Sequence, residues 1–227
     1  MYKEKRVSVI IPALNEELSL PMVINDLPEN IADEIIVVDN GSTDSTVSAA
    51  ENAGARVLKE NTRGYGAACQ KGISSAQDPD IIVILDGDYS DYPDRITLLL
   101  DPLIDRDFDM VIGSRVLGEA EKGSLTLPQI IGNKLTAWLI ARLTGFKYTD
   151  MGPFRAIKNE KLKGLKMADK NYGWNVEMQI KAVKQGFKIK EVPVDYRKRV
   201  GKSKVSGTVS GVMKAGVKII YSVFKYA

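Results

Sequence analysis

Short runs of Val, Ile and Leu recur along the first half of the chain and alternate with more polar segments that are long enough for helices. The apolar runs cover residues 7–11, 34–39, 55–59, 80–86 and 109–114. Runs such as 81–85 are apolar at every position, which indicates strands buried on both faces. The alternation predicts βαβ units, and therefore an α/β fold with a mostly parallel sheet flanked by helices.

Polar residues mark the expected helix ends. Ser19 before Leu-Pro and the Ser-Thr-Asp-Ser stretch 42–45 favour helix starts, and Gly54 favours a helix end. After Ser114 the alternation stops, because residues 115–130 mix charge, glycine and proline. This segment predicts a long loop, which in a compact domain is often a functional lid.

Helical patterns resume in the second half, at 130–144, 159–167 and 175–185, and a strand pattern lies within 187–196. From Val205 the apolar positions keep helical spacing to Phe224 with lysines alongside, which predicts an amphipathic C-terminal helix. We expect a main domain over residues 1–204 and an appended helix over 205–227.

Composition supports a globular chain: of 227 residues, 44% are hydrophobic, which suffices for a sizeable core. The single cysteine, Cys69, excludes an intramolecular disulfide and fits a reducing compartment; its small neighbours predict a buried helix thiol. No apolar run reaches the roughly 18 residues of a membrane span, and none near the start resembles a signal peptide. We expect a cytoplasmic protein, with a peripheral position on the inner face of the membrane as the alternative.

The charge is unevenly distributed. The net charge is +3, yet the chain from Lys181 onward carries 12 Lys and Arg against two acids, and residues 1–180 have a net charge of −7. The basic C-terminal fifth is suited to an anionic partner, although a solvated lysine-rich face explains it equally well. We expect no nucleic-acid partner.

Polar clusters follow three of the predicted strands. They read PALNEE after the first strand, DNGSTD after the second and DGDYSD after the fourth. In open α/β sheets, ligands bind beyond the carboxyl ends of the strands, so we expect these clusters to meet at one edge.

Asp86 and Asp88 are the strongest candidates for metal ligands. Two residues apart at a strand end, their side chains point to the same side, with Cα atoms roughly 7 Å apart in extended chain. The chain has no histidine, the commonest zinc ligand, which leaves oxygen ligands of the kind that Mg²⁺ and Mn²⁺ prefer. A structural turn that caps a helix near Asp94 would explain Asp91 and Asp94, but not the first two aspartates.

Other interpretations of these motifs fit less well. Counted from Asp86, the sixth and twelfth positions of an EF-hand loop would be Asp91 and Thr97, where Gly and Glu are needed. A phosphatase with an Asp-x-Asp motif would carry it after the first strand of its core. Gly64 and Gly66 lack the third glycine of a dinucleotide-binding turn.

Taken together, the segments VSVIIPALNEE, IIVVDNGSTDST, GYGAACQKGI, VILDGDYSDYP, VIGSR and TDMGPFRAI resemble family 2 glycosyltransferases of the GT-A fold. The resemblance spans about residues 7–204. The later segments YGWNVEMQIKA and EVPVDYRKRVGKSKVSG are similar to the branch of dolichyl-phosphate mannose synthases and bacterial polyprenyl-phosphate glycosyltransferases.

The resemblance implies roles for individual residues. Those expected to hold the nucleoside of a nucleotide-diphosphate sugar are Pro12, Leu14, Glu16 and Asp39. Asp86 and Asp88 would contact the ribose and a divalent ion, Mg²⁺ or Mn²⁺, and Ser90 stands where relatives can place a further metal ligand. Those expected to be catalytic are Arg115 near the sugar or phosphates, and Asp150 and Arg155 at the acceptor side.

Some of these residues also have plain structural interpretations. Arg155 would form a structural ion pair with Asp150, and Glu177 would either face the acceptor or be the buried partner of a basic side chain. Trp174 and Tyr172 fit the core better than a sugar-stacking role.

The resemblance implies inverting transfer of a hexose from a UDP- or GDP-sugar to a polyprenyl or dolichyl phosphate. A phosphate monoester is already anionic at pH 7, so its attack requires no base. The residues expected to clasp this phosphate are Arg197, Lys198, Arg199, Ser203 and Lys204. The amphipathic helix would lie on the membrane surface that presents the lipid.

Two alternatives remain open at this point. In the first, the same enzyme class acts on a soluble or saccharide hydroxyl, with Asp150 as the base. In the second, more remote, the chain is phosphatase-like or a non-catalytic nucleotide-binding protein.

Overall fold

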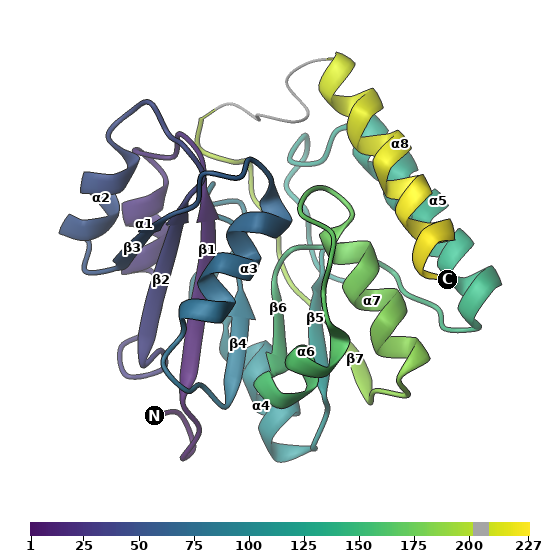
Figure 1. Ribbon diagram of the computed structural model, residues 1–227, viewed down its shortest axis with the longest axis horizontal. Helices are drawn as coiled ribbons and strands as arrows, with labels where there is room; N and C mark the ends of the chain where they lie inside the picture. Colours follow the sequence, from purple (N-terminus) through teal and green to yellow (C-terminus); the bar gives the residue numbers. More distant parts are fainter. Residues whose placement is uncertain (202–208) are drawn as a thin grey trace.

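The computed structural model describes residues 1–201 and 209–227, so Ser203, Lys204 and the expected helix start at Val205 lie outside the described residues. Its centre is a seven-stranded sheet in the order β3-β2-β1-β4-β6-β5-β7 (Figure 1). The strands are β1 (Val7–Ala13), β2 (Glu34–Asp39), β3 (Arg56–Lys59), β4 (Ile81–Ile84), β5 (Met110–Ser114), β6 (Arg155–Lys158) and β7 (Ile189–Pro193). The α/β architecture and six of these strands confirm the sequence prediction.

Strand β6 was not predicted, and it is the one strand that runs against its neighbours. It pairs antiparallel with β4 and with β5, with Arg155 opposite both Ile84 and Ile112, whereas the other strand pairs are parallel. Its four residues have a basic side chain at each end, so they show no apolar run that would predict a strand.

Helices cover both faces of the sheet, as its fully apolar strands require. On one face, α1 (Leu20–Asn25), α2 (Thr46–Asn52) and α4 (Thr97–Asp105) enclose a core with Val9 and Ile11 of β1. On the other, the core includes Ile10 of β1 and side chains from α3 (Tyr65–Ser75), α5 (Leu127–Thr144), α6 (Asn159–Leu165), α7 (Trp174–Lys184) and α8 (Val209–Tyr226). Cys69 is fully buried in α3, which confirms the predicted helix thiol.

Two local predictions need correction. Helix α5 begins at Leu127 instead of 130, because Thr126 and Gln129 form a capping box and Pro128 lies in its first turn. Asp94 is not a helix cap: it lies inside a short 3₁₀ turn, η1 (Pro93–Arg95), and its carboxylate is 3.4 Å from the guanidinium of Arg95.

Helix α8 packs against α5 and α7 (Figure 1). Ala215, Ser222 and Val223 face inward and are buried, and the Lys218 ammonium lies 2.8 Å from the Asp169 carboxylate. Among the described residues, no helix combines the length and the hydrophobicity that a bilayer crossing requires. The division into residues 1–204 and 205–227 stays a prediction.

Candidate active site

The loops after β1 and β2 are joined at the carboxyl edge of the sheet. The Asn15 side-chain oxygen accepts a hydrogen bond from the Thr43 amide at 2.8 Å, and the Asn15 amide donates to the Ser42 hydroxyl at 2.9 Å. The Glu16 amide donates to the Thr46 hydroxyl at 2.8 Å. The predicted meeting of PALNEE and DNGSTD is therefore present.

The residues expected to hold a nucleoside lie along these two loops. Asp39 ends β2, is buried, and accepts a hydrogen bond from the Ser42 amide at 2.9 Å. The Glu16 carboxylate accepts from the Ser19 hydroxyl at 2.8 Å, while Pro12 and Leu14 are half-buried at and just beyond the end of β1. All four thus lie at one edge, and their contact with a nucleoside stays a prediction.

The Asp86-Gly87-Asp88 turn lies next to these loops. A Cβ on Gly87 would come within 3.3 to 3.5 Å of Leu20, Ile11 and the Pro12 carbonyl, so the absence of a side chain lets the turn lie against β1. Burial, and then the neighbouring Asp88 charge, raises the pKa of Asp86 to about 7. The turn therefore holds Asp86 where burial and the Asp88 charge disfavour its ionisation.

Asp88 is engaged by the cationic segment that follows β7. The Arg199 guanidinium lies 2.9 Å from its carboxylate, and the Val200 amide donates to its carbonyl at 3.0 Å. The Ser90 hydroxyl donates to the Asp88 carboxylate, and its oxygen lies 2.9 Å from the Tyr196 hydroxyl. The Ser90 oxygen thus lies beside the acidic pair, and its role as a ligand stays a prediction.

Asp91 is not part of a solvated turn. Its side chain is 2% exposed, and neither carboxylate oxygen has a hydrogen-bond partner. Burial, and then the Asp86 charge, raises the pKa of Asp91 well above its usual range, while Arg115 opposes that shift. Asp91 therefore belongs to the acidic cluster at the sheet edge.

Arg115 and Asp150 form a two-point ion pair. The Arg115 Nε and Nη2 atoms each lie 2.7 Å from an oxygen of Asp150, and the Arg115 amide donates to the same carboxylate at 2.9 Å. Burial by itself would raise the pKa of Asp150, but the hydrogen bonds and charge of Arg115 hold it below its ordinary value. Asp150 is an ionised carboxylate whose oxygens are already occupied.

Arg155 does not supply that ion pair, so the structural pair expected between Arg155 and Asp150 is wrong. Its side chain is fully buried, and the guanidinium donates to the Gly152 carbonyl and to the Pro153 carbonyl, the second at 3.3 Å. Arg155 thus fixes the turn that leads from Asp150 into β6. A direct role at the acceptor side stays a prediction.

Three residues that the sequence did not suggest hold the Asp150 loop. Glu191 of β7 accepts from the Thr149 amide at 2.8 Å and from the Asp150 amide at 3.0 Å. Asn133 of α5 donates to the Thr149 carbonyl, and Gln179 of α7 donates to the Asp150 carbonyl, both at 3.0 Å. These residues lie far apart in sequence and no role was expected for them, so only the fold brings them together.

The segment 197–200 is ordered by contacts with the Asp-x-Asp loop. The Arg197 guanidinium lies 3.3 Å from the centre of the Tyr89 ring, and its Nε donates to the Tyr89 carbonyl at 2.7 Å. Lys198 is exposed, and its amide donates to Glu121 of the expected lid at 3.0 Å. Arg199 thus lies at the acidic pair, whereas Arg197 fixes the loop, and a contact of Lys198 with the acceptor stays a prediction.

Glu177 and Trp174 are both structural residues of the core. Glu177 is fully buried, pairs with Lys181 at 2.6 Å, and accepts from the Ala168 and Asp169 amides, so it is the buried partner of a basic residue. Trp174 is 1% exposed in the core.

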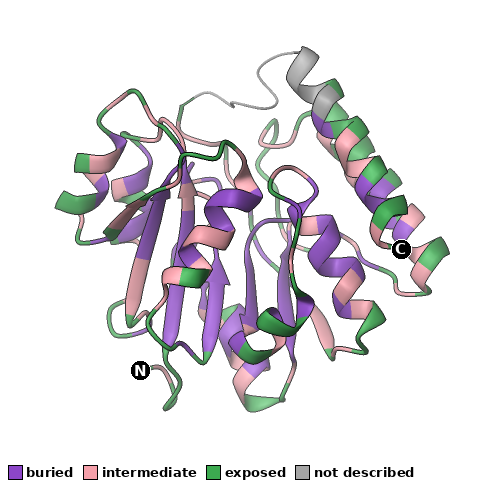
Figure 2. Ribbon diagram, viewed as in Figure 1, coloured by how far each residue is buried: buried purple, intermediate pink, exposed green. Residues whose placement is uncertain are grey.

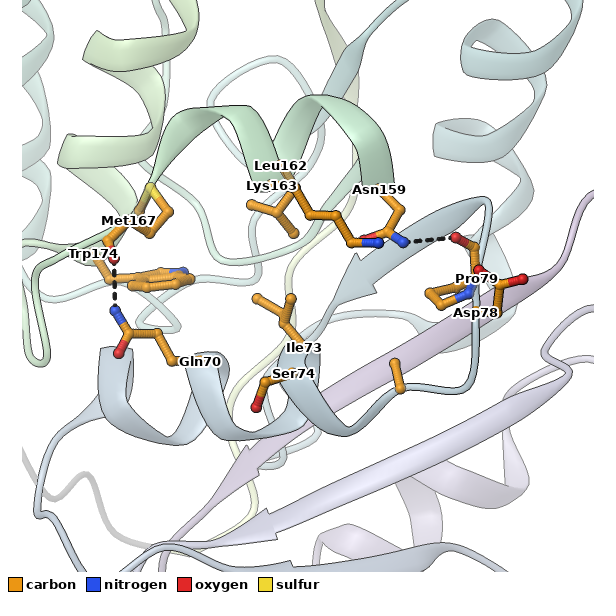
Figure 3. Close-up of a pocket in the computed structure, with 11 residues that line it drawn as sticks. Gln70, Ile73, Ser74, Asp78, Pro79, Asn159, Leu162, Lys163, Met167 and Trp174 are labelled. Carbon is orange, nitrogen blue, oxygen red and sulfur yellow. Dashed lines mark hydrogen bonds between the residues drawn. The ribbon is translucent and has the colours of Figure 1, made fainter.

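A cavity of about 480 Å³ lies elsewhere, between α3 and α6 (Figure 3). Trp174 closes one end, and Asp78, Pro79 and Asn159 line the other, next to the start of β4. The side-chain amide of Asn159 donates to the Pro79 carbonyl at 2.8 Å. None of the predicted site residues lines this cavity. The end lined by Asp78, Pro79 and Asn159 lies at the start of β4, whereas the Asp-x-Asp turn follows the end of that strand.

The acidic cluster suits a divalent ion that is shared with a ligand. Within residues 1–201 and 209–227, no three acidic or cysteine side chains form a ready metal cage. Carboxylates outnumber guanidinium groups in the cluster, which holds Asp86, Asp88, Asp91, Asp150, Arg115 and Arg199. A pair of carboxylates completed by phosphate oxygens is a common way to hold Mg²⁺, so the residues present fit such an ion.

The sheet order and the acidic carboxyl edge agree with the expected GT-A fold, and comparison with known proteins gives the class of protein. The sequence model of "Glycosyl transferase family 2" matches residues 8–166. The chain therefore belongs to glycosyltransferase family 2, and it is a glycosyltransferase. The predicted family is confirmed.

Similar proteins cover nearly the whole chain. An uncharacterized glycosyltransferase of Mycobacterium tuberculosis is 34% identical over 209 residues, 90% of this chain and 92% of that protein. A dolichyl-phosphate hexose transferase of Haloferax volcanii is 32% identical over 221 residues, 94% and 93% of the two chains. This relative supports the resemblance to the polyprenyl-phosphate branch.

Among solved structures, glucosyl-3-phosphoglycerate synthase of Mycobacterium tuberculosis, in complex with Mn²⁺, UDP and phosphoglyceric acid, has a similar fold. The TM-score is 0.82 at 23% identity, with 99% of this chain and 79% of the other covered. At this identity the likeness concerns the fold.

Proposed function

We propose that this protein transfers a hexose from a UDP- or GDP-sugar to a polyprenyl phosphate, with inversion at the anomeric carbon. The observation that carries the choice of acceptor is the Arg115–Asp150 ion pair. A hydroxyl acceptor needs a base, yet Asp150, the expected base, is held as a low-pKa carboxylate by hydrogen bonds at 2.7 Å. A phosphate monoester needs no base at neutral pH.

The donor would lie along the β1 and β2 loops. Asp39 and Glu16 lie along these loops, where they would contact the nucleoside, and the diphosphate would extend toward Asp86 and Asp88. The residues that would hold Mg²⁺ or Mn²⁺ are Asp86 and Asp88, with Ser90 as the neighbouring oxygen. When bound, the ion would neutralise charge on the departing nucleoside diphosphate. The structurally similar synthase was solved with Mn²⁺ and UDP, which supports this choice.

The acceptor phosphate would meet the cationic side of the site. Arg199 already faces Asp88 at 2.9 Å, and the next residue toward the N-terminus, Lys198, is exposed. These cations would orient the acceptor oxygen toward the anomeric carbon. The dolichyl-phosphate hexose transferase similarity supports a lipid phosphate as acceptor. A lipid acceptor implies a peripheral membrane contact through the C-terminal helix.

A donor and acceptor panel tests the proposal. UDP- and GDP-hexoses are incubated with polyprenyl phosphate, with Mn²⁺ or with EDTA, and lipid-linked hexose is detected by mass spectrometry. We expect product with one donor class, in the presence of Mn²⁺ only. Transfer to a saccharide but not to polyprenyl phosphate would refute the acceptor, activity unchanged by EDTA would refute the metal, and release of inorganic phosphate from small phosphoesters would indicate a phosphatase.

A further inference from the structure

Trp174 carries a buried hydrogen-bond donor that no described residue uses. The side chain is 1% exposed, and its Nε1–H has no acceptor within residues 1–201 and 209–227. Buried donors in native proteins almost always have a partner, because an unpaired one costs free energy. The nitrogen lies on the side of the indole that faces the cavity between α3 and α6 (Figure 3), which we call the α3–α6 cavity. The acceptor that this donor lacks would therefore lie in that cavity.

The α3–α6 cavity has the size and the lining of a small-molecule site. Its volume of about 480 Å³ falls in the range of about 300 to 1,000 Å³ that is common for ligand pockets. Its middle is apolar, with Ile73 of α3 on one side and Leu162 of α6 on the other (Figure 3). Met167 lies beside the indole, and its unbranched, flexible side chain is the group that an entering ligand would displace. An apolar molecule with an acceptor at one end fits this part of the cavity.

The end of the cavity away from Trp174 carries two opposite charges. Lys163 of α6 and Asp78 both line the cavity and are exposed, and neither side chain forms an ion pair with a described residue. In Figure 3 the Lys163 side chain extends toward Asn159, which lies next to Pro79 and Asp78. A ligand with a single charge would be attracted by one of these groups and repelled by the other, whereas a zwitterion matches both.

We propose that the α3–α6 cavity binds a free α-amino acid whose apolar side chain ends in a hydrogen-bond acceptor, as in tyrosine. The carboxylate of the ligand would pair with Lys163, and its ammonium with Asp78. Its apolar part would lie between Ile73 and Leu162. The oxygen at the far end would accept from Trp174 Nε1, which satisfies the buried donor.

This site is separate from the acidic edge of the sheet. The cavity reaches the start of β4, whereas the Asp-x-Asp turn follows the end of that strand. Amino-acid binding is therefore a property apart from hexose transfer, and it is measured without donor sugar, acceptor or metal.

Four probes distinguish the three contacts. They are L-tyrosine, tyramine, which lacks the carboxylate, desaminotyrosine, which lacks the ammonium, and L-phenylalanine, which lacks the acceptor oxygen. Binding to the full chain is measured by saturation-transfer NMR, and by Trp174 emission in a Trp138→Phe background, since the chain has two tryptophans. We expect tyrosine to bind and to change the Trp174 emission, and each other probe to bind about fivefold or more weakly.

Two variants test the charged end of the cavity. Lys163→Gln should weaken tyrosine binding about fivefold or more and leave tyramine binding unchanged, because tyramine has no carboxylate. Asp78→Asn should weaken tyrosine binding similarly and leave desaminotyrosine binding unchanged; Asn tolerates the left-handed backbone of this residue, with a φ of 48°. The matched control is Lys161→Gln, which removes the same charge from the same helix outside the cavity and should bind tyrosine within about twofold of the wild type. Circular dichroism confirms that the variants fold.

Several results would overturn the proposal. They are no binding of any probe, equal binding of tyrosine and tyramine, Trp174 emission unchanged at saturating tyrosine, or equal losses in Lys161→Gln and Lys163→Gln. Hexose transfer plays no part in these measurements, so a failure of the proposed function would leave their outcome unchanged.

Discussion

Replacing Arg115 by Met should destabilise the fold strongly, because it leaves the Asp150 carboxylate buried without its cation. Asp150 is 1% exposed and the Arg115 side chain 14%, with two contacts of 2.7 Å between them. Breaking a buried pair by removing one partner costs about 3–5 kcal/mol. For a chain of this size, that corresponds to a fall of about 6 to 20 °C in Tm.

The lowered pKa of Asp150 determines how this loss of stability depends on pH. Arg115 holds the pKa of Asp150 below its ordinary value although burial alone would raise it, so the pair stabilises the folded state above about pH 4. That stability is lost as the pH falls through the lowered folded pKa. The difference in unfolding free energy between wild type and Arg115→Met should thus be largest near neutral pH and narrow in acid.

A second substitution, Asp150→Asn, tests whether the ion pair is the source of this stability. Asp150→Asn removes the charge but keeps a side-chain oxygen that accepts from the backbone amide of residue 115. In the Arg115→Met background it should therefore restore about 1–3 kcal/mol of the unfolding free energy. Urea unfolding followed by circular dichroism gives the four free energies of the cycle. If the double variant loses the sum of the two single losses, the ion pair is not the source of the stability.

Three further predictions follow from single contacts. Leu99→Ala, at a fully buried site in α4, should lower the unfolding free energy by about 2–5 kcal/mol, whereas Leu98→Ala, which is 42% exposed, should change it by about 0.5 kcal/mol or less in urea unfolding. Gly152→Ala places a Cβ 2.9 Å from the Gly113 carbonyl and 3.2 Å from an Asp150 oxygen, so it should cost about 1–3 kcal/mol, and an unchanged Tm would contradict this contact. Asp88→Asn should reduce hexose transfer by about a hundredfold or more with its Tm within a few degrees of wild type, and retained turnover would exclude the residue from the metal and diphosphate site.

The sequence predicted the elements whose signal is local. Runs of β-branched residues identified β1, β2 and β4, because strands buried on both faces are nearly continuous apolar runs. The acidic clusters at their ends predicted one edge for Asp39, Asp86 and Asp88. The hydrogen bonds between the β1 and β2 loops, and the close approach of Gly87 to Pro12, confirm that edge. Periodicity and motif spacing suffice for such features.

Pairing between distant side chains could not be predicted in the same way. From the sequence, Arg155 was the expected structural partner of Asp150, but Arg115 takes that place. The difference depends on side-chain direction: Arg155 points into the sheet core, whereas Arg115 follows the end of β5 at the edge. The burial of Asp91 could not be predicted for the same reason. In the sequence Asp91 lies in a polar turn, but in the structure the segment 197–200 covers this turn and the carboxylate is buried. Burial by a remote segment leaves no local pattern.

The direction of β6 explains why the acceptor-side residues reach the site at all. Because β6 runs antiparallel to β4 and β5, its first residue, Arg155, lies opposite Ile84, the last residue of β4, and opposite Ile112 in the middle of β5. The preceding loop, with Asp150, is thereby delivered to the same edge as Asp86 and Asp88. A parallel β6 would place that loop at the other end of β4, roughly 10 Å away for a strand of this length. Strand β6, which the apolar pattern did not predict, thus brings the Arg115–Asp150 pair to the acidic edge, and the Asn133 contacts connect the Asp150 loop to α5.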